Sequence, residues 1–221
     1  MKQIAVIIAS GCLLAGASSA FADGEAAASQ KCGCWYIGTG VGYSQVSIDD
    51  IPPIAGVTFT QSKDENDTGW KIFGGYNFNP NFAIEGGYVD LGKFNLSANI
   101  TAPISAAFSA DIKFSGPFLD LVGIWPVAEN FSLYAKGGGI YASSKTDVSA
   151  TPALAAAFTA AGIVSDSSDD LKGMAGLGAQ FDFNRNFGVR GEWERYFSLG
   201  TNGSGKGDVD LFSANLIYTF F

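Results

Sequence analysis

The sequence contains no histidine among its 221 residues, and it contains only 3 cysteines. The missing histidine excludes histidine-dependent nucleophilic triads and histidine zinc sites. Cys32 and Cys34 form a single CxC pair, which is too little for the framework of a disulfide-stapled domain. We therefore expect no catalytic residue, no metal site and no cofactor. The CxC pair is predicted to constrain a short segment, by a local disulfide or, alternatively, through a metal or redox role.

Positive charge is also scarce. The chain has 13 lysine and arginine residues against 21 acidic ones, which gives a formal net charge of −8. No basic stretch departs from this balance, so the charge argues against a nucleic-acid partner. Acidic clusters such as Asp49-Asp50 and residues 165–170 are interpreted as solvated loops, with calcium binding as the alternative.

Long apolar runs are confined to the N-terminus. One early cation, Lys2, precedes an apolar run from Ile4 to Leu14, and small residues follow up to an A-x-A pattern that ends at Ala22. This pattern is typical of a cleaved secretory signal peptide. Acylation of Cys12, as in a lipoprotein, is the alternative, but the apolar run before that residue is short. No later window is long enough for a transmembrane helix.

The rest of the chain is nevertheless rich in apolar residues, and they alternate with small or polar ones. In one such segment Trp35, Ile37, Val41 and Tyr43 fall on one face, with glycines and Ser44 on the other, which is the period of a β-strand. A tilted transmembrane strand needs about 9–11 residues, close to the length of these segments. Eight segments share the pattern: residues 35–48, 69–78, 82–91, 110–125, 131–143, 171–183, 187–197 and 213–221.

The predicted connections alternate in length. Tight turns are expected at residues 79–81, 126–130 and 184–186, and longer loops at 49–67, 92–109, 144–170 and 201–208. Short turns on one side and long loops on the other are typical of an outer-membrane barrel. We predict an all-β, eight-stranded antiparallel transmembrane barrel in which the first strand pairs with the last, because lipid tolerates no open edge. A soluble β-sandwich is the alternative fold.

Strand parity predicts what faces the lumen and what faces lipid. Lys71 lies between Trp70 and Ile72, as expected for a strand of which one face lines a polar lumen. The charges expected to point inward, as ion-paired networks, are Lys71, Glu85, Lys136, Lys172, Asp182, Arg190, Glu192 and Glu194. The aromatic residues expected at the two membrane interfaces are Trp35, Trp70, Tyr76, Tyr88, Trp125 and Trp193.

Two long motifs add a resemblance. GWKIFGGYNFNPNFAIEGGYVDLG, residues 69–92, and the pair FGVRGEWERYFSLG and GDVDLFSANLIYTF, within residues 187–220, are similar to the OmpA-like transmembrane domain family of Gram-negative bacteria. The resemblance implies a barrel inserted by the outer-membrane assembly machinery, which reads a C-terminal strand ending in an aromatic residue. The residues that match this signal are Tyr218 and Phe220, with Phe221 one position beyond the usual end. Better-known members also carry a peptidoglycan-binding domain, which is not expected here.

We therefore predict three parts: a cleaved signal peptide at 1–22, an N-terminal periplasmic segment at 23–34, and an outer-membrane barrel at 35–221. The expected partners are outer-membrane lipid, lipopolysaccharide and the assembly machinery, with the protein itself a monomer. The expected role is structural, in the cell envelope. A narrow or gated channel and adhesion through apolar loops, such as residues 152–163, are the alternatives. We interpret Glu192 and Glu194 as ion-pair partners rather than as a catalytic acid/base pair.

Overall fold

The computed structural model describes residues 33–46, 58–64, 66–102, 106–151, 166–199 and 207–220. These residues form one antiparallel sheet of nine strands. The strands are β1 (Cys34–Val46), β2 (Thr58–Asp64), β3 (Asn66–Asn79), β4 (Phe82–Ala102), β5 (Ala106–Ala128), β6 (Phe131–Ala150), β7 (Asp166–Asp182), β8 (Phe187–Leu199) and β9 (Gly207–Thr219). No helix within these ranges is long and apolar enough to cross a membrane.

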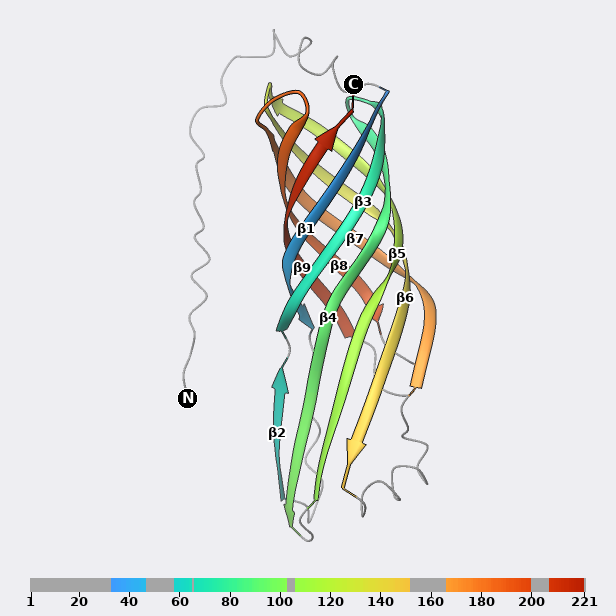
Figure 1. The fold of residues 1–221 in the computed structure, drawn as a ribbon, viewed down its shortest axis with the longest axis vertical. Coiled ribbons are helices and arrows are strands. Elements are labelled where there is room, and N and C mark those ends of the chain that lie inside the picture. The colour runs from blue at the N-terminus through green and yellow to red at the C-terminus, as the bar shows by residue number, and fades with distance from the viewer. Residues whose placement is uncertain are drawn as a thin grey trace.

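All strands except β2 close into an eight-stranded barrel (Figure 1). Neighbours along the chain pair with each other, and β1 pairs with β9 from Tyr36 opposite Thr219 to Val46 opposite Val209. This pairing removes the two open edges that the first and last strands would otherwise present. The predicted fold and its closure are thus confirmed.

The two faces of the wall alternate as the period of the sequence predicts. In β1, Trp35, Ile37 and Val41 are exposed on the outside, whereas Tyr36 is buried inside. Inward glycines make room for the large residues of the narrow lumen: a Cβ on Gly75 would overlap the Tyr36 ring. The wall therefore presents apolar side chains outward and a tightly packed interior inward, as a membrane barrel requires.

Three short connections lie at one end of the barrel, which we call the tight-turn end. After β3, the Asn79 side-chain oxygen accepts hydrogen bonds from the backbone N–H groups of Asn81 and Phe82, at 2.8 and 2.9 Å. After β7, Asn184 makes the same contacts to Asn186 and Phe187, at 2.9 and 2.8 Å. Asparagine favours such turns because its side chain replaces a backbone partner. These turns lie where the sequence predicts them.

Strands extend further than predicted at the opposite end, which we call the extended end. Most of residues 92–109, expected as a loop, continue β4 and β5, and β6 runs on to Ala150. Gly92 explains the difference: it adopts a φ of 86°, and the β4–β5 register shifts between Asp90 and Lys93, so the chain forms a bulge and pairing resumes. With β2 paired to β4, these segments form a sheet that projects beyond the barrel at the bottom of Figure 1.

Candidate functional site in the barrel interior

A cluster of ionisable side chains fills the lumen toward the tight-turn end. Each occupies an inward position of its strand and is at most 5% exposed. We call the cluster the charged layer; it consists of Lys71 (β3), Glu85 (β4), Asp120 (β5), Lys136 (β6), and Arg190, Glu192 and Glu194 (β8).

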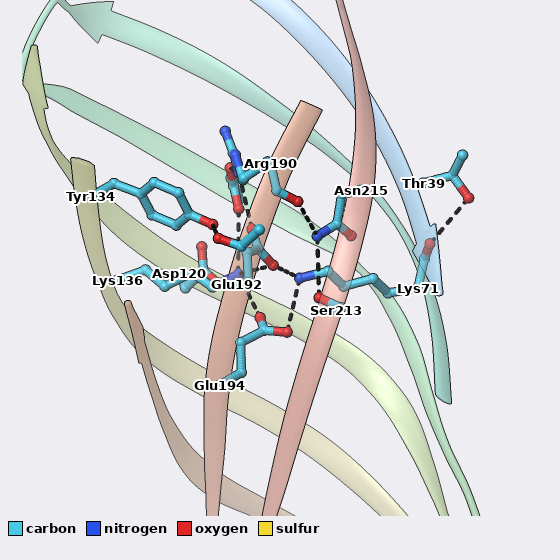
Figure 2. Close-up of polar contacts among 12 residues, drawn as sticks. Thr39, Lys71, Asp120, Tyr134, Lys136, Arg190, Glu192, Glu194, Ser213 and Asn215 are labelled. Carbon is cyan, nitrogen blue, oxygen red and sulfur yellow. Dashed lines mark hydrogen bonds and ion pairs between the residues drawn. The ribbon is translucent and has the colours of Figure 1, made fainter. Parts of the chain in front are cut away.

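Two lysines in this layer connect strands that are not neighbours in the barrel. The Lys71 ammonium group lies 2.8 Å from a Glu194 oxygen and also pairs with Glu192. The Lys136 ammonium group lies 2.5 Å from Glu194 and 3.4 Å from Glu192 (Figure 2). Lys136 is also within 3.7 Å of Asp120 and 3.8 Å of Glu85. Because each carboxylate of β8 has cations from more than one strand, the pairs form one network rather than separate bridges.

Arg190 anchors the same network from β8. Its guanidinium pairs with Glu85, lies 3.4 Å from Glu192, and donates a hydrogen bond to the Gln180 side-chain oxygen at 3.0 Å. The Tyr36 hydroxyl donates to Glu85 at 2.7 Å, so that carboxylate has both a cationic and a neutral donor. The Arg190 guanidinium also lies 4.7 Å from the centre of the Tyr134 ring, within range of a cation–π interaction.

The charges in this layer do not cancel. Four carboxylates face three cations, all buried. Asp120 is the least compensated carboxylate: neither of its oxygens has a hydrogen-bond partner among the described residues, and its cation lies 3.7 Å away. Buried charges are tolerated only when they are paired, and removing one partner leaves an uncompensated charge. The layer is therefore a cross-brace between strands whose members depend on one another.

A second layer of the interior is apolar and lies toward the extended end. Along β4, β6 and β8 the buried inward residues change from charged to apolar as each strand leaves the tight-turn end. We call this group the apolar layer; its buried members are Val46, Val89, Leu91, Phe94, Phe114, Ile140, Ala142, Met174, Tyr196, Leu199, Val209 and Leu211. Gly69 lies next to this layer: a Cβ there would be 2.9 Å from a Leu211 methyl group and 3.6 Å from the Leu91 Cα. Side chains thus fill the lumen at both levels.

The match to known proteins covers the whole barrel. The model of the OmpA-like transmembrane domain family matches residues 30–221. The chain belongs to this family. It is an outer-membrane β-barrel, and as such it sits in the lipid bilayer.

Solved structures share the fold of this OmpA-like chain at low sequence identity. Ail, the attachment invasion locus protein of Yersinia pestis, is 18% identical; the alignment covers 86% of this chain and 99% of Ail, with a TM-score of 0.52. Neisserial surface protein A is 10% identical; the alignment covers 84% of this chain and 97% of that protein, with a TM-score of 0.50. No curated protein sequence matches the chain.

Two of the charges expected inside the OmpA-like barrel do not join the charged layer. Lys172 is 15% exposed at its side chain and lies 3.5 Å from Asp170, its neighbour on β7. Asp182 lies near the tight-turn end of β7 and accepts a hydrogen bond from Gln180 at 2.8 Å. Conversely, Asp120 belongs to the layer and is missing from the predicted set, although its position between Leu119 and Leu121 in β5 carries the same alternating signal.

The expected interfacial aromatic residues lie on the outer face of the OmpA-like barrel. Trp35, Trp70, Tyr88 and Trp125 are 64%, 45%, 40% and 71% exposed. Tyr76 and Trp193 are half-buried, and the Tyr76 ring lies 4.9 Å from the Trp35 ring. At the end of β9, the Tyr218 ring and the ring of Phe220, which is 46% exposed, lie edge to face with their centres 4.9 Å apart. The set therefore lies on the outer face of the wall rather than in the lumen.

Other expectations fall outside the described residues. These are the signal peptide, Cys32, Phe221, the acidic pair Asp49-Asp50 and the apolar loop at 152–163. Cys34 is described and buried at the start of β1. Within the described ranges, no group of histidine, cysteine, aspartate or glutamate side chains could hold a metal ion.

Proposed function

We propose that the protein is a non-conducting outer-membrane barrel whose main role is structural, as a rigid element of the cell envelope. The observation that carries the proposal is the double filling of the lumen. An ion would have to break the charged layer and then cross the apolar layer, in which Leu91, Ile140 and Leu211 are fully buried. A bare ion in such an apolar medium is strongly disfavoured, since nothing replaces its hydration shell.

Conductance across a planar lipid bilayer tests this proposal. Refolded mature protein, residues 23–221, is inserted into the bilayer, and a general porin in the same membrane shows that stepwise currents are detectable. We expect no current steps from the protein at neutral pH. Steps whose frequency scales with the amount of inserted protein would favour the narrow channel that the sequence left open as an alternative.

The proposal extends to assembly and orientation. The signal peptide is cleaved after Ala22, the tight-turn end faces the periplasm, and the extended end faces outward, as in other barrels with one set of short turns. The outward aromatic pair Tyr218 and Phe220 supports a role for β9 as the strand that the assembly machinery reads. The barrel acts as a monomer among outer-membrane lipid and lipopolysaccharide, without a catalytic step.

A second candidate function is partner binding at the cell surface. The specific observation is the sheet of β2 with the ends of β4, β5 and β6, which projects beyond the barrel. Ail, which has the same fold, is named as an attachment protein and has been crystallised with the heparin analogue sucrose octasulfate. Such a sheet offers a stable outer surface on which a partner could bind.

A shortened hairpin tests this second function. In the variant, residues 96–110 are replaced by the turn Asn-Gly, which joins the paired residues Asn95 and Asp111. If the projecting sheet carries adhesion, cells that express the variant lose binding to host cells while cells with the full-length chain bind. Equal binding by both chains would remove the sheet from consideration.

A further inference from the structure

Three lysines lie side by side on the outer face of the wall at the extended end. Lys93 of β4 is directly opposite Lys113 of β5, which is directly opposite Lys145 of β6. We call this set the lysine row. All three point outward, since their neighbours Phe94, Phe114 and Ser144 are buried inside.

Only the middle lysine of this row has an ion-pair partner among the described residues. Like charges directly opposite each other on neighbouring strands repel and weaken a sheet. Asp90 neutralises Lys113 at 2.9 Å. Among the described residues, Lys93 and Lys145 have no ion-pair partner, and both are exposed. Two uncompensated ammonium groups therefore flank a compensated one, an arrangement that an anion bound between the strands would stabilise.

The position of the row fits the level of lipid headgroups. On the same outer face Tyr88 and Tyr141 are exposed, and aromatic residues of this kind collect at membrane interfaces. Tyr88 also donates a hydrogen bond to Ser115 at 3.0 Å. Lys145 lies four residues beyond Tyr141, which is about 13 Å along a strand and about 9 Å along the membrane normal at a tilt of about 45°. The polar region of a bilayer extends about 5–8 Å beyond the hydrocarbon on each side. The Lys145 side chain can extend back toward the membrane and cover the difference between these two distances.

We propose that the lysine row binds the phosphate of an anionic lipid headgroup in the external leaflet, the phosphate of lipid A. The site consists of the Lys93 and Lys145 ammonium groups on either side of the Lys113–Asp90 pair. This proposal rests on the proposed function only for the orientation of the barrel. Lys93 and Lys145 are then the residues through which the outer face of the barrel recognises lipopolysaccharide.

The outward residues next to Lys113 and Lys145 favour a lipid over a soluble polyanion, because they are carboxylates on the water side and serines on the membrane side. One row farther from the barrel, Asp111 of β5 is directly opposite Asp147 of β6, and both are exposed. A sulfated glycan that arrives from the water meets these carboxylates first and is repelled. On the membrane side, the positions next to Lys113 and Lys145 carry Ser115 and Ser143, with Asp90 and Asp169 on either side of them. A headgroup that arrives from the membrane therefore reaches the row between two serines.

Native mass spectrometry of refolded protein with bisphosphorylated lipid A tests the site. The variant is Lys93→Gln/Lys145→Gln, and the matched control is Arg185→Gln, which removes an exposed cation at the tight-turn end. We expect lipid A affinity to fall at least about tenfold in the double variant, since each surface cation contributes to binding anionic lipid, and to be unchanged in the control. Lipid A without phosphates should bind the wild type and the double variant equally weakly.

Two results would overturn the proposal. One is equal binding of bisphosphorylated lipid A by the wild type and the double variant. The other is a double variant that loses binding of sucrose octasulfate but keeps that of lipid A, which would assign the row to a soluble polyanion. Heat-dependent gel mobility shows that each variant is a closed barrel. Failure here leaves the bilayer conductance result unaffected, because the row lies outside the lumen.

Discussion

At the scale of single residues, Lys71 illustrates how much the interior depends on each partner. It is fully buried and pairs with both Glu192 and Glu194 of β8. Replacing it with methionine keeps the volume but leaves four buried carboxylates with two cations. We expect Lys71→Met to lower the free energy of unfolding by about 3–5 kcal/mol, the usual cost of breaking a buried pair. Urea-induced unfolding in detergent micelles measures this change.

Lys172 provides the matched control for that experiment. It is also an inward-facing lysine, but its side chain is 15% exposed and its partner Asp170 is 47% exposed. Water can solvate both groups, so Lys172→Met should cost clearly less than Lys71→Met. Equal losses in the two variants would mean that the charged layer is hydrated and does not brace the barrel.

At the scale of whole strands, the barrel should not need the projecting sheet. In the variant with residues 96–110 replaced by Asn-Gly, the pairing of β4 and β5 between Phe82 and Lys93 remains. The Phe94 and Phe114 rings, 6.1 Å apart, stay on the barrel side of the new turn. We expect the unfolding free energy to change by less than about 0.5 kcal/mol, as for changes away from a core. A lost heat-dependent gel shift would show instead that the sheet is part of the barrel's stability.

The same strands show what the sequence can and cannot predict. Inward and outward faces follow from the period of two, so the alternation alone identifies Lys71, Glu85, Lys136 and Arg190 as inward residues. The ends of the strands do not follow from the alternation. Gly92 is typical of a loop, and only the structure shows that the chain forms a bulge there and that strand pairing resumes. The partners within the charged layer are also beyond sequence reasoning. Lys71 and Glu194 are 123 residues apart, and their contact depends on how the strands tilt around the lumen.

At the scale of the whole molecule, the apolar layer was the least predictable feature. Alternation along β9 places Leu211 on the inner face with Ser213 and Asn215, and Phe212, 50% exposed, on the outer face. It does not predict that the inner residues change from polar to apolar at Leu211. A polar lumen is the ordinary expectation for a membrane barrel. The structure instead separates the interior into the charged layer and the apolar layer. The charged layer connects strands that are not neighbours, and the apolar layer fills the lumen with side chains that offer an ion almost no polar contacts.

Opening the apolar layer should therefore allow the barrel to conduct ions. Leu91 and Leu211 are both fully buried in the apolar layer next to Gly69, so the double variant Leu91→Ser/Leu211→Ser makes this part of the layer polar. We expect current steps in planar bilayers that the wild type does not show, because water can then enter from the extended end and hydrate the ionised side chains of the charged layer. The matched control is Leu121→Ser/Leu216→Ser, whose leucines are 65% and 50% exposed on the outer face, and it should stay silent. Steps from the control as well would indicate a damaged wall, and silence from the inner variant would mean that the charged layer alone closes the lumen.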